Sequence, residues 1–125
     1  MATILVIDDD RFFAELVSLH LLLAGHTVQV AKDPEEGLRA IVTGPPDLIL
    51  LDLDLPYMSG FEVLEALRSD PSSRGIPVVM LTARKDEESY ARCDKIGIDG
   101  FLTKPLQSDR LNEAITAALA AHART

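Results

Sequence analysis

Short apolar runs alternate along the chain with segments whose apolar residues have helical spacing. Mainly apolar runs at residues 4–7, 48–51 and 76–81 are typical of strands buried on both faces of a sheet. Thr27 to Ala31 alternates apolar with polar side chains, as a half-buried strand does, and residues 101–103 form a further short run. The pattern therefore predicts five strands.

The segment after the first strand has the periodicity of a helix. Over residues 11–24, Phe12, Leu16, Leu19 and Leu23 recur three or four residues apart, and a glycine follows directly. Apolar residues at this spacing lie along one side of a helix, and glycine is the commonest residue just past a helix end. The spacing therefore predicts a first helix over residues 11–24.

Four more segments between the strands are also expected to be helical. Asp33 and Pro34 are a typical helix start, an N-cap acid followed by proline at the first helical position. We expect this second helix to bury Leu38, Ile41 and Val42. The remaining helices are expected around Phe61 to Leu67, over residues 86–96 and from Ser108 onward.

The alternation of strands and helices indicates the fold class. Five strands, each followed by a helix, argue for a parallel sheet covered by helices on both faces, which is the doubly wound α/β class. A chain of 125 residues is long enough for one hydrophobic core and too short for two. We therefore expect a single domain spanning residues 1–125.

Composition and charge narrow the possible functions. The net charge of −8 argues against direct nucleic-acid binding by this domain, because neutralising phosphates needs a basic face. No apolar run approaches the ~20 residues of a membrane helix, so no membrane association is expected. The single cysteine cannot form an internal disulfide, which suits a reducing compartment. These features predict a cytoplasmic protein.

Polar side chains gather where the predicted strands end. Asp8 and Asp9 follow the first strand, Asp52 the third, Thr82 the fourth and Lys104 the fifth. In a parallel sheet with right-handed crossovers, the carboxyl ends of all strands share one edge, and ligands bind there. An aspartate run alone could be an ordinary helix cap, but four segments converging on one edge predict a functional site.

These residue types suit phosphoryl transfer to aspartate. Carboxylates held close together raise one another's pKa, and a divalent cation such as Mg²⁺ (or Mn²⁺) relieves the strain. Lys104 and Thr82 can bind phosphoryl oxygens, and Asp52 can act as the nucleophile. Asp54 and Arg84 are expected to pair beside the approach to Asp52, and thereby to tune how long a phosphoryl group persists.

Over essentially its whole length, the chain resembles the response-regulator receiver domains of two-component signalling. That resemblance implies a flavodoxin-like (βα)5 fold with strand order 2-1-3-4-5. The matching segments are Ile4 to Asp10, Asp47 to Leu53, Pro56, Gly60, Val78 to Ala83 and Phe101 to Pro105.

The resemblance also implies roles for the site residues. Asp52 would accept a phosphoryl group from a sensor histidine kinase or a histidine phosphotransfer protein. Asp9, Asp52 and the backbone carbonyl of Asp54 would ligate Mg²⁺ directly, and Asp8 would act largely through water.

A further set of residues would couple phosphorylation to partner binding. By the same resemblance, Thr82 and Lys104 would bind the phosphoryl oxygens, and the rotamer of Phe101 would change with the state. The Lys104–Pro105 peptide bond would be cis, a form essentially restricted to proline. A downstream protein target would then bind the face made by the fourth helix, the fifth strand and the fifth helix.

Some features depart from the family pattern, and two other functions remain open. Residues 109–116 lack the arginine-rich pattern of receivers that drive winged-helix transcription factors, and Gly100 stands where an acid is common. One alternative is a pseudo-receiver that binds partners without phosphorylation. The other is an aspartyl-phosphate hydrolase, which Asp54 would suit as a second acid two residues after Asp52, although such enzymes usually carry a cap insertion.

Overall fold

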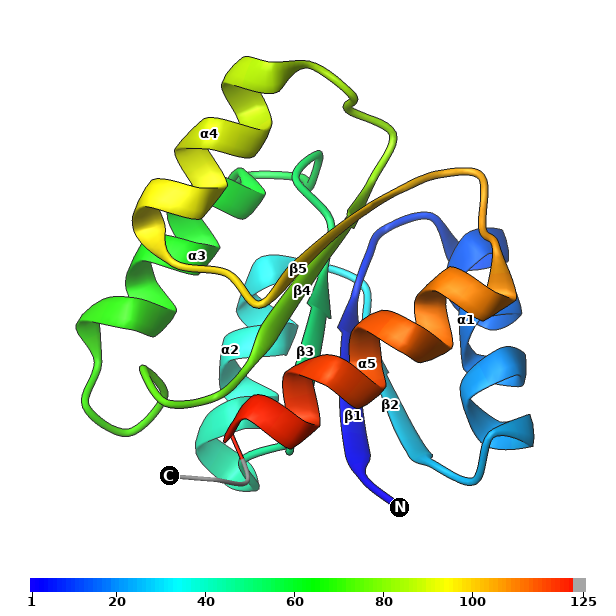
Figure 1. Ribbon diagram of the computed structural model, residues 1–125. Helices are drawn as coiled ribbons and strands as arrows, with labels where there is room; N and C mark the ends of the chain where they lie inside the picture. Colours follow the sequence, from blue (N-terminus) through cyan, green and yellow to red (C-terminus); the bar gives the residue numbers. More distant parts are fainter. Residues whose placement is uncertain (123–125) are drawn as a thin grey trace.

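The computed structural model describes residues 1–122. Each of its strands is followed by a helix (Figure 1). The strands are β1 (Thr3–Ile7), β2 (Thr27–Ala31), β3 (Leu48–Leu51), β4 (Val78–Thr82) and β5 (Gly100–Thr103). The helices are α1 (Arg11–Leu23), α2 (Pro34–Thr43), α3 (Gly60–Ser69), α4 (Glu87–Ile96) and α5 (Ser108–His122). Within residues 1–122, no helix is long and apolar enough to cross a membrane.

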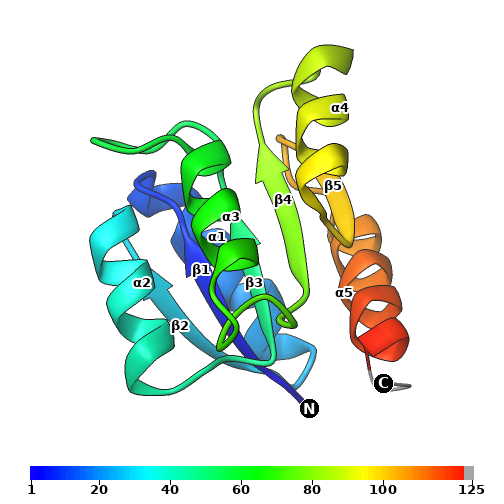
Figure 2. The ribbon, with the colours of Figure 1, turned by 90° about the vertical axis from the view of Figure 1, so that its left-hand side faces the viewer.

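The strands form one parallel sheet in the order β2-β1-β3-β4-β5, as predicted. Helices cover both of its faces, with α1 and α5 on one side and α2, α3 and α4 on the other (Figures 1 and 2). The carboxyl ends of all strands therefore lie at one edge of the sheet. We call this edge the rim.

The side chains of the central strands alternate between two hydrophobic clusters. In β3, Ile49 and Leu51 pack with α3, whereas Leu48 and Leu50 pack with α1 and α5. All four are fully buried, because a strand in the middle of a helix-covered sheet has no solvent face. This burial explains why β3 appears in the sequence as an uninterrupted apolar run.

Polar caps begin the helices on the rim side of the sheet. The side chains of Asp10, Asp33, Ser59 and Asp86 each accept a hydrogen bond from a backbone N–H in the first turn of α1, α2, α3 and α4. Such caps satisfy N–H groups that have no partner within the helix. The predicted start of α2 at Asp33 and Pro34 is confirmed.

Two helices differ from the packing that their spacing suggested. In α2, Ile41 is buried and Leu38 packs against the core, as predicted, but the prediction for Val42 is wrong, because Val42 is 84% exposed. Pro34 and Gly37 are also buried on this inner face. A Cβ at Gly37 would collide with the Ile7 side chain, so this glycine lets α2 approach β1 closely.

The other helix is α1. Its buried residues are Ala14, Val17 and Leu21, so the apolar residues whose spacing predicted the helix lie at the surface. Both sides of α1 are apolar, and spacing alone therefore could not show which side packs against the sheet.

Candidate functional site

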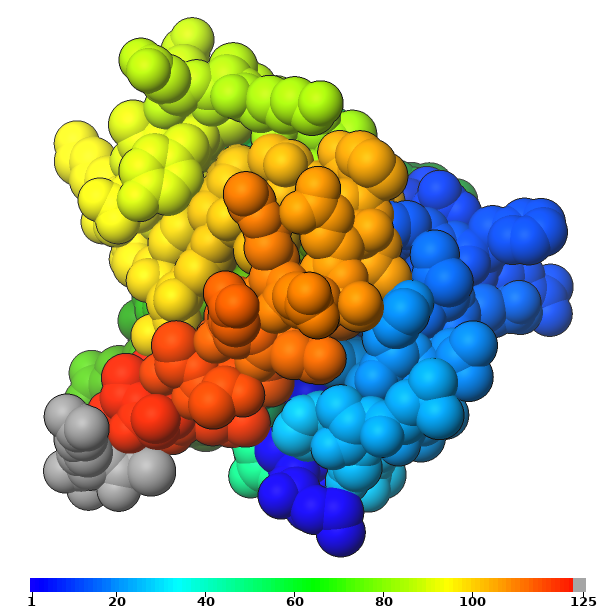
Figure 3. All heavy atoms as spheres, turned by 45° about the vertical axis from the view of Figure 1, so that its right-hand side comes forward, coloured from blue at the N-terminus to red at the C-terminus, as the bar shows by residue number. Residues whose placement is uncertain are grey.

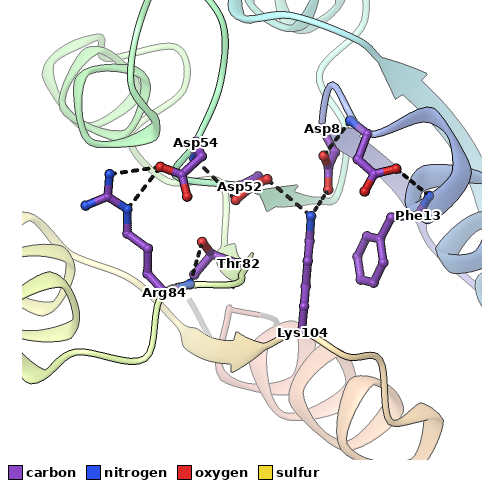
Figure 4. Close-up of polar contacts among 8 residues, drawn as sticks. Asp8, Phe13, Asp52, Asp54, Thr82, Arg84 and Lys104 are labelled. Atoms are coloured by element: carbon purple, nitrogen blue, oxygen red, sulfur yellow. Dashed lines mark hydrogen bonds and ion pairs between the residues drawn. The ribbon is translucent and has the colours of Figure 1, made fainter.

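The predicted polar side chains meet at the rim (Figure 4). Asp8 lies one residue past β1, Asp52 one residue past β3 and Lys104 one residue past β5, while Thr82 is the last residue of β4. Asp8, Asp52 and Thr82 are buried, and Lys104 is half-buried. Burying charged groups is costly unless they are paired, so the buried carboxylates of Asp8 and Asp52 need a positive charge nearby.

Three carboxylates form the acidic part of the site. Asp8, Asp9 and Asp52 each offer an oxygen, and these oxygens all lie within 4.8 Å of one another. Asp9 is exposed, which leaves space for water on that side. Hard oxygen donors with room for water are the ligands that Mg²⁺ prefers, so the donor set fits a divalent cation.

Lys104 balances the buried acids. Its Nζ lies 3.0 Å from Asp8 Oδ2 and 3.3 Å from Asp52 Oδ2, and 4.2 Å from the centre of the Phe13 ring. Burial lowers the pKa of Lys104, but the two carboxylates outweigh this effect and raise it. Burial raises the pKa of Asp8, which the Asp10 N–H and Lys104 oppose. The Lys104–Pro105 peptide bond that follows is cis.

The loop after β3 holds Asp52 in place. The backbone N–H of Asp52 donates to Ile7 O at 3.1 Å, and the N–H of Asp54 donates to Asp52 Oδ1 at 3.3 Å. Gly60, the first residue of α3, donates to Leu53 O at 2.8 Å. A Cβ at Gly60 would collide with the carbonyl oxygen of Asp52, so glycine at this position lets the start of α3 pack closely against the backbone of Asp52.

Thr82 and Phe101 lie on the side of the site toward α4. The Thr82 hydroxyl accepts a hydrogen bond from the Arg84 N–H at 3.3 Å, and Thr82 O accepts from the Lys104 N–H at 2.8 Å. Phe101 is half-buried, and its ring meets that of Tyr90 edge-on, with the centroids 5.4 Å apart. The end of β4 is thus tied to the end of β5, and β5 to α4.

Arg84 pairs with Asp54 at the outer border of the site. Its Nη2 and Nε lie 2.8 and 3.0 Å from Asp54 Oδ1, and both side chains are about half exposed. The hydrogen bond to Asp54 raises the pKa of Arg84. The guanidinium groups of Arg84 and Arg92 lie 5.9 and 4.1 Å from the centre of the Phe61 ring, so two helices contribute to this border.

Known proteins share both this sequence pattern and this fold. The pattern of the response regulator receiver domain matches residues 4–116. This chain belongs to the receiver domain family. The receiver is 41% identical to the DNA-binding dual master transcriptional regulator RpaA of Synechocystis, over 95% of this chain and 49% of RpaA. It spans about half the length of the curated relatives it matches.

Solved structures show the same architecture. A putative response regulator from Chloroflexus aurantiacus superimposes with a TM-score of 0.91 at 32% identity, covering 95% of this chain and 98% of that one. The Vibrio cholerae chemotaxis protein CheY4 gives a TM-score of 0.88 at 30% identity, covering 94% and 98%. The chain is therefore a signalling domain of two-component response regulators rather than a conventional metabolic enzyme.

The fold of the receiver brings together the site residues that the sequence suggested. It also places two further residues, Phe13 and Phe61, against the site. Phe13, beside Lys104, and Phe61, beside Arg84 and Arg92, take part in cation–π contacts that sequence reasoning missed. No spacing signal could have found them, because each contact joins separate elements far apart in the sequence.

Proposed function

We propose that this chain is a phosphorylation-driven switch in which Asp52 accepts the phosphoryl group, and that residues 1–125 act as one receiver unit. The observation that supports this proposal most is the setting of Asp52. This carboxylate is buried at a strand end, with one oxygen held by the Asp54 N–H and the other facing Lys104. The hydrogen bond from Asp54 orients the nucleophilic carboxylate, and the Lys104 ammonium group can stabilise the negative charge of an incoming phosphoryl group.

The proposed transfer takes the phosphoryl group from a phosphohistidine of a sensor histidine kinase or a phosphotransfer protein. A carboxylate oxygen of Asp52 forms the new O–P bond while the N–P bond breaks, and the bonding electrons stay on the donor imidazole. Lys104, whose Nζ lies 3.3 Å from Asp52 Oδ2, and the Thr82 hydroxyl would hold the phosphoryl oxygens. Relatives that are response regulators support this donor class.

Asp8, Asp9 and Asp52, with the Asp54 carbonyl, would hold the Mg²⁺ or Mn²⁺ ion. When bound, the ion would neutralise charge on the phosphoryl oxygens. Asp9 and Asp52 would be direct ligands, and Asp8 would act through water while keeping its contact with Lys104. Asp10 is excluded from this set, because its side chain accepts from the Phe13 N–H at the start of α1.

Phosphorylation would then change the face made by α4, β5 and α5, where we place the downstream protein target. The phosphoryl oxygens would draw the Thr82 hydroxyl inward, and the space so opened would admit the Phe101 ring. Asp52 and Phe101 would thus be coupled through the end of β4. A shift between two packings of one face is a common form of switching.

Intact mass spectrometry after incubation with Mg²⁺ and a small-molecule phosphodonor tests the proposal. We expect the wild type to gain one phosphoryl group and Asp52→Asn to gain none. Asp54→Asn is the matched control, because it removes a neighbouring carboxylate and should leave incorporation intact. Full labelling of Asp52→Asn would refute the assignment. No labelling of the wild type would favour the pseudo-receiver, and multiple turnover of a phosphate ester would favour the hydrolase.

A further inference from the structure

The aromatic ring of Phe13 lies against the ammonium group of Lys104. Lys104 Nζ stands over this ring, 4.2 Å from its centre. A lysine ammonium group within about 6 Å of an aromatic face is attracted by the negative charge density of that face, and more strongly where water is excluded. The Lys104 side chain is only 16% exposed, so water has little access to this contact.

The ring and the carboxylates lie on different sides of the ammonium group. Lys104 Nζ has three N–H donors, and the Asp8 and Asp52 carboxylates, at 3.0 and 3.3 Å, can accept from two of them. Figure 4 shows the Phe13 ring on the side of Lys104 that faces away from Asp52. The ring therefore closes the direction in which the ammonium group could swing away from Asp52.

Phe13 is itself held in place through its backbone and its side chain. Its N–H donates to Asp10 Oδ1 at 3.1 Å, and the Asp10 N–H donates to Asp8 Oδ1 at 2.9 Å. Its side chain packs against the hydrophobic cluster on the α1 and α5 side of the sheet. Figure 3 shows the segment after β5, in orange, directly beside α1, in blue. The start of α1 thus presents a fixed ring to a lysine from the other side of the site.

We propose that Phe13 is a positioning residue for phosphoryl transfer, whose ring holds the Lys104 ammonium group beside Asp52. A lysine side chain is long and flexible, and charges stabilise a transition state best when they are in place before the reaction. The two carboxylates alone do not select one position, because Asp8 competes with Asp52 for the same ammonium group. This role rests on the proposed function of Asp52 as the acceptor.

The rate of phosphoryl incorporation from a small-molecule phosphodonor with Mg²⁺ tests the proposal. Phe13→Leu keeps an apolar side chain but removes the ring, so we expect the rate to fall about three- to tenfold. Phe13→Tyr keeps the ring and should retain most of the wild-type rate. Phe12→Leu is the matched control, because it makes the same change at the neighbouring position, which is 88% exposed, and should leave the rate unchanged.

A fluorinated ring separates the charge distribution of the ring from its bulk. Pentafluorophenylalanine at position 13 has nearly the shape of phenylalanine, but its face is electron-poor and no longer attracts a cation. It should slow incorporation as Phe13→Leu does, whereas the same amino acid at position 12 should not. A wild-type rate with the fluorinated ring at position 13 would show that the ring only fills space.

Proton NMR reads the position of Lys104 without any phosphorylation. Protons above an aromatic face resonate at lower chemical shift, so the ε-CH₂ protons of Lys104 should be displaced in the wild type and in Phe12→Leu, but not in Phe13→Leu. An undisplaced signal in the wild type would overturn the contact. Equal rates in a labelled wild type and Phe13→Leu would overturn the role of the ring and leave Asp52 as the acceptor. A wild type that gains no phosphoryl group would overturn both.

Discussion

Asp9 and Asp10 are neighbours in sequence with different surroundings. Asp9 offers an oxygen to the acidic cluster, while Asp10 caps α1. Asp9→Asn should therefore raise the dissociation constant for Mg²⁺ by at least about tenfold, and Asp10→Asn by less than about twofold, because asparagine keeps the cap. Metal titration of both variants checks this. Equal losses would mean that the metal ligand is misassigned.

We propose that the Arg84–Asp54 pair borders the path by which water would reach an acyl phosphate on Asp52. The pair is exposed, so it contributes only ~0–1 kcal/mol to stability. Its effect on the access of water is a separate matter, because the Arg84 side chain would also cover that path. Arg84→Ala should speed dephosphorylation several-fold by freeing both the path and Asp54, which can orient a water.

The matched variant for this prediction adds Asp54→Ala to Arg84→Ala and should slow the decay again. Loss of phosphate from the purified phosphoprotein, followed by mass spectrometry, gives both rates. A decay rate that Arg84→Ala leaves unchanged or lowers would show that the pair shields nothing.

Among the helices, α4 carries the only cysteine of the chain on its inner face. Burial raises the pKa of the Cys93 thiol from its ordinary 9.0 to about 11, slightly offset by Arg92. The unfolded thiol would ionise first, so stability is full below pH 9 and falls as the pH rises toward 11. The fall attributable to this thiol should reach ~3 kcal/mol at most.

Denaturant unfolding of wild type and Cys93→Ala between pH 8 and 11 tests this dependence. The difference in unfolding free energy between the two proteins should narrow across that range, because only the wild type loses the contribution of the buried thiol. A constant difference would show that the thiol titrates alike in the folded and unfolded chains. The comparison cancels the lysine and tyrosine titrations common to both proteins.

The sequence alone predicts most of the strands and helices, and the physical reason differs from one element to the next. β3 is predictable because both of its faces are buried and its residues must all be apolar. α1 was predictable as a helix but not in its orientation, since Ala14, Val17 and Leu21 compete with equally periodic apolar residues on the outer side of the helix. The fourth strand starts at Val78 rather than residue 76, because Pro77 has no N–H to donate to a neighbouring strand.

The site was predictable in composition and less so in detail. Asp52 and Lys104 could be placed at one edge because parallel strands end there together. Two details could not be predicted: the contact of the Phe13 ring with Lys104, and the close approach of Gly60 to the backbone of Asp52. Both depend on how separate elements pack, and the spacing of residues along the sequence does not encode that packing.

Across the whole molecule, the proposed switch links the site to the face made by α4, β5 and α5. Thr82 belongs to the site and its backbone is bonded to the end of β5, so Thr82→Ala should still accept a phosphoryl group while losing most of the phosphorylation-dependent change on α4, β5 and α5. Amide NMR spectra of the phosphorylated and unphosphorylated variant give the measurement. A full shift in Thr82→Ala would show that the signal travels by another route.

The edge-on contact between Tyr90 and Phe101 gives the protein a built-in optical signal. The chain has no tryptophan and two tyrosines, so its intrinsic fluorescence comes from tyrosine. Tyr57 is fully exposed, whereas Tyr90 is half-exposed and touches the ring expected to move. In Tyr57→Phe, emission would report Tyr90 alone, and the kinetics of the switch would become readable without a label. An emission that phosphorylation leaves unchanged would mean that Phe101 keeps its place.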